Sequence, residues 1–182
     1  MINEAEKITE ELAVLEIPLN RDLFMRTLIR ELADVLQNVV GDEQASSFIS
    51  VVGQVMGKRI NECYCKALDA ASLSREQVAA VLVDLKKRID GDFFIVEQND
   101  DKIVLGSRSC PFDEKVVGQK TMCMMTSNVF GSIAAANLGY AKVHLQATLA
   151  GGQSECRVVV FLTMGDEADA AEGREYFKST VE

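Results

Sequence analysis

The residues with the most specific chemistry in this chain are its cysteines, of which there are five. Cys110, Cys123 and Cys156 each fall at the boundary of an expected element: a loop, the first turn of a helix and the start of a strand. Thiolates bind zinc and iron, and the positive end of a helix dipole favours the thiolate form of Cys123. The spacing C-x12-C-x32-C is not that of a zinc finger. The three thiols therefore either converge on a metal or remain separate buried groups.

The other candidate side chains favour structural roles. Cys63 lies on the apolar face of a helix, which predicts a place in the core, and Cys65 is turned about 200° away toward the polar side. His144, the single histidine, lies on the polar side of an alternating strand, where a solvated side chain is favoured over a base or a ligand. The sequence holds no glycine-rich phosphate loop, no helix with paired histidines and no catalytic pair of carboxylates. These absences indicate that the protein is not a conventional enzyme.

The first half of the chain is expected to be helical. Residues 1–19 form a short helix or a tether that ends at Pro18, and longer helices are expected over residues 20–40, 42–70 and 72–89. Asn20 is a suitable N-cap, Gly41 a suitable C-cap, and Ser74 with Gln77 resembles a capping box.

Apolar side chains recur at helical spacing along the first two long helices, and they would suit the seam of a dimer. The stripe of the first helix is Phe24, Leu28, Leu32, Val35 and Val39, and that of the second is Phe48, Val52, Val55, Met56, Ile60, Cys63 and Ala67. The second helix also carries Gly53 and Gly57, whose four-residue spacing predicts a close contact with another helix.

The period then changes to that of strands. Residues 92–97 and 102–108 are expected to form a hairpin, residues 109–119 a cysteine-bearing loop, and residues 120–138 a helix. A second hairpin follows over residues 141–149 and 155–163, in which Cys156 shares the inward face of Leu149. The predicted fold is α+β, with an antiparallel sheet of about four strands and helices packed on it. Residues 20–164 form this single domain, and residues 165–182 an acidic tail.

The overall charge limits the partners. The chain has 182 residues and a formal net charge of -9, so it repels phosphate, and direct binding to nucleic acid or to anionic lipid is not expected. The N-terminus lacks the apolar segment of a signal peptide, and no apolar run approaches the roughly 18 residues of a membrane span. We therefore expect a cytoplasmic protein with reduced thiols that acts through a regulatory or signalling protein.

The stretch from Cys110 to Leu162 carries a recognisable pattern. Cys-Pro-Phe is followed by Met-Cys-Met-Met at a helix start, by Asn-Leu-Gly-Tyr before an alternating strand, by Gly151-Gly152, and by Glu-Cys-Arg-Val-Val. Over residues 22–164 the chain resembles the methanogen output domain of signalling proteins. It is also similar to the four-vinyl reductase sensor domain and to the C-terminal half of the cluster-sensing repressor of iron–sulfur biogenesis. The resemblance implies helices, a hairpin, a cysteine loop, a helix and a closing hairpin with a third cysteine.

By resemblance to the repressor, Cys110, Cys123 and Cys156 would be the ligands of an iron–sulfur cluster, with zinc as the alternative. A cluster normally takes four ligands. The fourth would be water or one of four side chains: Cys63, Asp113, His144 or Glu155. The repressor's winged DNA-binding half has no counterpart here, which agrees with the acidic charge.

Three functions compete at this stage. The first is a sensor that reads redox or metal status through the three cysteines. The second is a small-molecule sensor of the vinyl-reductase type, with Met122, Met124 and Met125 in an adaptable pocket wall. The third is an adaptor module that forms a homodimer through its first two long helices.

Overall fold

The computed structural model describes residues 4–112 and 116–178, and within them the chain has the α+β fold that its sequence predicts. Four helices come first: α1 (Glu4–Ala13), α2 (Arg21–Val40), α3 (Asp42–Ala67) and α4 (Arg75–Lys87). The hairpin of β1 (Phe93–Gln98) and β2 (Lys102–Ser107) follows, and then α5 (Lys120–Leu138). The chain continues through β3 (Tyr140–Ala147), the short helix η2 (Leu149–Gly151), β4 (Cys156–Phe161), α6 (Asp166–Ala170) and β5 (Arg174–Phe177).

The helix ends lie at the predicted capping residues. The side chain of Asn20 accepts a hydrogen bond of 2.8 Å from the Leu23 amide, and Gly41 ends α2 with a φ of 80°, which favours glycine. Ser74 opens α4 in a capping box with Gln77, in which each side chain accepts from the backbone amide of the other residue.

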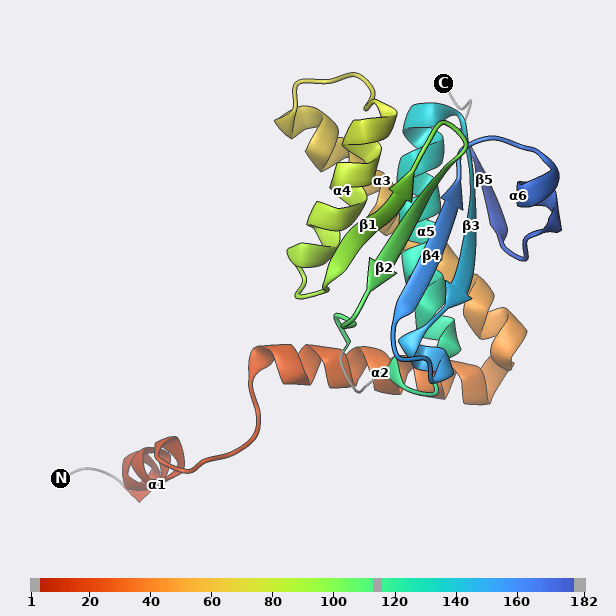
Figure 1. The fold of residues 1–182 in the computed structure, drawn as a ribbon. Helices are drawn as coiled ribbons and strands as arrows, with labels where there is room; N and C mark the ends of the chain where they lie inside the picture. Colours follow the sequence, from red (N-terminus) through yellow and green to blue (C-terminus); the bar gives the residue numbers. More distant parts are fainter. Residues whose placement is uncertain (1–3, 113–115, 179–182) are drawn as a thin grey trace.

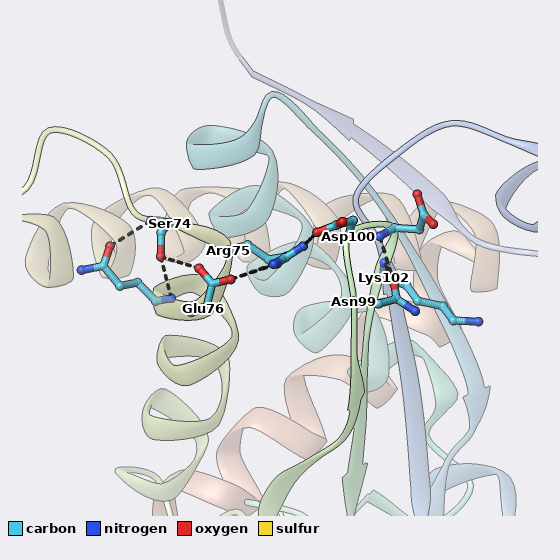
Figure 2. Close-up of polar contacts among 8 residues, drawn as sticks. Ser74, Arg75, Glu76, Asn99, Asp100 and Lys102 are labelled. Atoms are coloured by element: carbon cyan, nitrogen blue, oxygen red, sulfur yellow. Dashed lines mark hydrogen bonds and ion pairs between the residues drawn. The ribbon is translucent and has the colours of Figure 1, made fainter.

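Polar contacts connect the start of α4 to the turn between β1 and β2 (Figure 2). Arg75 pairs with the neighbouring Glu76 at 2.8 Å and also with Asp100 in that turn. The side chain of Asn99 shapes the turn by accepting a 2.9 Å hydrogen bond from the amide of Lys102. Exposed ion pairs of this kind add little stability, but they align α4 with the first hairpin.

The sheet is antiparallel throughout, with the strand order β1-β2-β4-β3-β5. The fifth strand is drawn from the segment expected to be an acidic tail, and it pairs with the first half of β3. In the same segment α6 places Ala168 against the outer face of the sheet, where it packs with Val104, Val159 and Phe161. Residues 179–182 of that segment lie outside the described residues.

Helix α5 lies between the inner face of the sheet and α3 (Figure 1). Its fully buried Phe130 and Ile133 pack in the main core with side chains of α4 and of the central strands. On the other side, Gly53 and Gly57 of α3 face α5. A Cβ atom on Gly57 would lie 2.8 Å from the Cβ of Ser132, which is closer than real contacts allow. The predicted close helix contact is thus confirmed.

The apolar stripes of α2 and α3 are largely uncovered by the rest of the chain, although Ile60 of the predicted α3 stripe packs against the main core. The exposed large apolar side chains of the two helices are 39–75% exposed, and we call them together the apolar surface. Its members are Phe24, Met25, Leu28, Ile29, Leu32, Val35 and Val39 of α2 and Phe48, Val51, Val52, Val55 and Met56 of α3. Helix α1 stands apart from the body (Figure 1). No helix in the described part of the chain is long and apolar enough to cross a membrane.

Candidate functional site

The three predicted cysteines lie around one end of α5. Each is half-buried, and Cys110 and Cys123 pack together with a small apolar cluster that includes Met122 and Ala150. The Thr148 side chain hydrogen-bonds to Cys123. The sulfur of Cys156 accepts a 3.4 Å hydrogen bond from the amide of Leu149, the residue expected to share its face. The η2 turn therefore holds two of the three thiols through consecutive residues.

A buried lysine lies beside these thiols. Lys86 of α4 is 5% exposed, and its Nζ donates a 2.7 Å hydrogen bond to Thr126 of α5. The ammonium also stands 5.2 Å and 5.4 Å from the ring centroids of Phe93 and Phe130, which is within cation–π range. Among the described residues, no carboxylate forms an ion pair with it.

The pKa of Lys86 is affected by the three cysteines. Burial lowers the pKa of this lysine to about 8, and the electrostatic influence of Cys110, Cys123 and Cys156 works against that shift. The contacts place the three cysteines in the same region: Cys110 and Cys123 pack in one apolar cluster with Leu149, whose amide donates to the sulfur of Cys156.

The expectation of a thiolate at Cys123 is wrong. Burial raises the pKa of this thiol to about 11, and the neighbouring Cys156 and Cys110 add to the rise. The Thr148 hydrogen bond and the charge of Lys86 act in the opposite direction but do not offset the desolvation of a charged sulfur. Cys123 is a neutral thiol at neutral pH unless a bound cation stabilises its charge.

The three thiols have the chemistry of metal ligands, but they do not lie close enough together to bind a metal. Three thiols beside an ammonium are suited to a thiophilic metal or an iron–sulfur cluster, since the ammonium would offset part of the negative charge of the thiolates. Across residues 4–112 and 116–178, however, no three side chains of histidine, cysteine, aspartate or glutamate come close enough together to hold a metal ion. The sulfurs would have to move toward one another to form a ligand cage.

Three of the four side chains considered as a fourth ligand lie in described parts of the chain, and no contact joins them to the three cysteines there. Cys63 and Glu155 are exposed. His144 lines a different pocket, where its Nδ1 contacts the carbonyl oxygen of Glu172. Asp113 lies outside the described residues.

The two cysteines of α3 have exchanged the positions expected for them. Cys63 was assigned to the core and is exposed, whereas Cys65 packs against the main core and lies 3.9 Å from Oδ1 of Asn137. The reason is that α3 buries its glycine face and not its apolar stripe. Cys65 follows Gly57 by eight residues, so it lies on the side of α3 that faces α5.

Lys86 is the site residue that the sequence reasoning missed. The sequence did indicate its burial, because Lys86 lies four residues after Leu82 and eight after Val78 and so shares the helix face of these two fully buried residues. A lysine in register with an apolar stripe is an indication of a buried ammonium, which needs a specific environment.

The comparisons with known proteins place this α+β fold in a class. The family model that matches the sequence gives the class: methanogen output domain 1, over residues 28–161. The chain belongs to this family, as its resemblance predicted. No curated protein matches the sequence.

Two solved structures have the same fold. One is the phenol-responsive sensory domain of the transcription activator PoxR, with phenol; it is 12% identical, has a TM-score of 0.59, and the match covers 85% of this chain and 81% of that one. The other is a trafficking protein particle complex subunit 3 from Naegleria fowleri, covalently bound to palmitic acid. It is 11% identical with a TM-score of 0.58, over 87% of this chain and 98% of that one. At these identities the likeness concerns the fold alone.

Proposed function

We propose that this chain is a cytoplasmic sensor or output domain whose sensing element is the cluster of Cys110, Cys123 and Cys156 around Lys86. The observation that carries the proposal is the neighbourhood of the thiols at the start of α5, where Cys110 and Cys123 share an apolar cluster with Leu149 and the Leu149 amide donates to Cys156. Membership of an output-domain family supports a role in signalling. The role is one of binding and relay rather than catalysis.

The three cysteines would hold an iron–sulfur cluster or, as the alternative, zinc, which would supply a charge that depends on redox state or metal supply. Lys86 has the task of offsetting the thiolate charge in a site from which water is largely excluded. Thr148 and Leu149 orient two of the sulfurs through their hydrogen bonds. Cys110 ties the loop after β2 to the start of α5, so a change at the thiols changes how that loop and helix pack.

The test is purification without oxygen, followed by a visible absorption spectrum and measurement of iron, acid-labile sulfide and zinc. The proposal expects bound iron with sulfide, or zinc, that disappears in the variant with Cys110→Ser, Cys123→Ser and Cys156→Ser. Cys63→Ser is the matched control, because this exposed cysteine lies outside the cluster, and it should keep the metal. A metal that stays in the triple variant, or a wild-type protein without metal, would refute the metal part of the proposal.

A small-molecule sensor is the second candidate, and the fold shared with a phenol-responsive sensory domain favours it. The three methionines of the predicted pocket wall have separate positions: Met122 is buried beside the cysteines, Met124 lines a surface pocket, and Met125 packs against the main core. Extraction of the anaerobically purified protein followed by mass spectrometry tests this candidate. The absence of any stoichiometric organic compound would count against a tightly held ligand.

A second copy of the chain is the partner that we propose for the apolar surface of α2 and α3. Its twelve large apolar side chains are exposed along two consecutive helices, and exposed apolar surface on this scale is typical of an interaction site. A standard protein interface covers about 800 Å² per partner, which is within the reach of two helices of 20 and 26 residues. A regulatory protein would then read the state of this dimer.

A further inference from the structure

A pocket of about 380 Å³ opens where β3 continues beyond the end of β5. β5 pairs with Tyr140–Val143, and among the described residues no strand pairs with the second half of β3 on that side. The chain before β5 crosses β3 so closely that a Cβ atom on Gly173 would lie 2.5 Å from the carbonyl oxygen of Val143. The walls come from β3, from Ser46 of α3, from α5 and from residues 172–174, and we call this space the β3-edge pocket.

Arg174 gives this pocket a positive charge that the described part of the chain does not neutralise. Its side chain is half-buried and donates to the hydroxyl of Ser50 on α3. Within residues 4–112 and 116–178 it has no ion pair with a carboxylate. A guanidinium has five N–H donors in a planar fork that matches a carboxylate, and most of them are left for a ligand.

His144 adds a polar group of defined orientation. Its Nδ1 contacts the carbonyl oxygen of Glu172, and because a carbonyl only accepts hydrogen bonds, Nδ1 carries the proton. The Glu172 carboxylate is the one acidic group of the lining, and it is exposed, where water and salt screen its charge.

The remaining walls are mixed. Met124, Val143 and Leu145 supply apolar surface, and Ser127 supplies a hydroxyl that hydrogen-bonds to Tyr176 at 3.0 Å. The volume is at the low end of the range for small-molecule sites, and the pattern of an apolar wall with a few fixed polar groups is typical of them. We infer that the β3-edge pocket binds a small organic carboxylate, with its carboxylate on Arg174 and its apolar part against Met124 and Leu145.

This inference does not rest on the thiol cluster. Two residues of the pocket lie on α5 within a turn of Cys123, and Ser46 lies on α3 beside the apolar surface. A ligand in the pocket would therefore contact both helices whose packing connects the cysteines to the dimer surface. A ligand bound there would be placed to influence the same proposed dimer surface as the thiols.

The single histidine provides the assay, because an untagged protein gives one imidazole Hε1 signal in an NMR spectrum. Benzoate is the probe and benzamide its neutral isostere. Benzoate should move the signal saturably, and benzamide should bind at least ~10-fold more weakly, because it lacks the charge that Arg174 recognises. Inorganic phosphate should also bind more weakly, since it cannot use the apolar wall.

Arg174→Gln should weaken benzoate binding by about 10- to 100-fold, whereas Arg59→Gln, which removes the same charge from an exposed position on α3, should leave it unchanged. The triple cysteine-to-serine variant should bind benzoate like the wild type, which separates this inference from the proposed function. Equal binding of benzoate and benzamide, tighter binding of phosphate, an unchanged Arg174→Gln variant, or no saturable shift would each overturn the inference. If circular dichroism shows that Arg174→Gln does not fold, Arg174→Lys and the comparison of the three probes on the wild type decide the question.

Discussion

Leu32→Glu on α2 should convert a dimer of this chain into a folded monomer. Leu32 is 61% exposed on the apolar surface, and full burial of a leucine is worth about 1.5–3 kcal/mol, so covering its exposed part contributes ~1–2 kcal/mol. In a symmetric dimer the residue occurs twice, which gives about 2–4 kcal/mol. The dissociation constant should rise by about 30- to 1,000-fold, and the desolvation of two carboxylates adds to this.

The assay is light scattering coupled to size-exclusion chromatography over a range of concentrations, with urea unfolding to verify that the variant folds. Ile89→Glu is the control, because Ile89 is equally apolar and 50% exposed but lies after α4, outside the apolar surface. A wild-type monomer at all concentrations, or a Leu32→Glu dimer as stable as the wild type, would refute the assignment of a second copy to this surface.

Two further predictions concern the scaffold. Gly57→Val should lower the free energy of unfolding by about 1–3 kcal/mol, because its side chain meets Ser132 of α5, whereas Gly165→Val, with open space around it, should change it by less than about 0.5 kcal/mol in urea denaturation. The backbone amide of Glu76 and then the Arg75 guanidinium hold the pKa of the Glu76 carboxyl at about 2, below its ordinary 4.5. Because the folded-state pKa is depressed, the stability advantage of wild type over Glu76→Gln should be complete above pH 4.5 and disappear as the pH falls through 2, and an advantage that grows on acidification would contradict this.

The local structure could be predicted because local residues determine it. Asn20, Gly41 and Ser74 cap their helices as expected, since a cap is a contact between residues two to four positions apart. The alternation of β3 likewise identified Val143 as buried. The fifth strand was not expected because the segment before it is acidic, and β5 is only four residues long.

The burial of each helix face could not be predicted in the same way. For a monomer, an apolar stripe indicates the face that packs on the core. In α3 the glycine face does so, because Gly53 and Gly57 allow α5 to approach, and the stripe with Val52 and Met56 is left exposed. The reversal exchanged the environments of Cys63 and Cys65. When a helix has two faces that could be buried, the sequence pattern alone does not show which face packs on the core and which is left exposed.

The candidate site shows the same division between local and tertiary information. The types and boundary positions of Cys110, Cys123 and Cys156 were evident in the sequence. Lys86 of α4 precedes Cys110 by 24 residues in the sequence, so only the packing of α4 against α5 brings it near them. The effect of burial on the Cys123 thiol also depends on that packing, and it reversed the expectation drawn from the helix dipole.

The contact between α3 and α5 would couple the thiols and the β3-edge pocket to the apolar surface. Cys123 and part of the wall of the β3-edge pocket lie on α5, and the α3 part of the apolar surface is exposed, away from the glycine face that packs on α5. At Gly53 and Gly57 the two helices touch with no α3 side chain between them. Close-packed contacts of this kind transmit a shift instead of damping it. We therefore propose that a change at the thiols or in the pocket moves α3 and alters the proposed dimer surface, and by linkage dimerisation would then alter affinity at either site by the same factor.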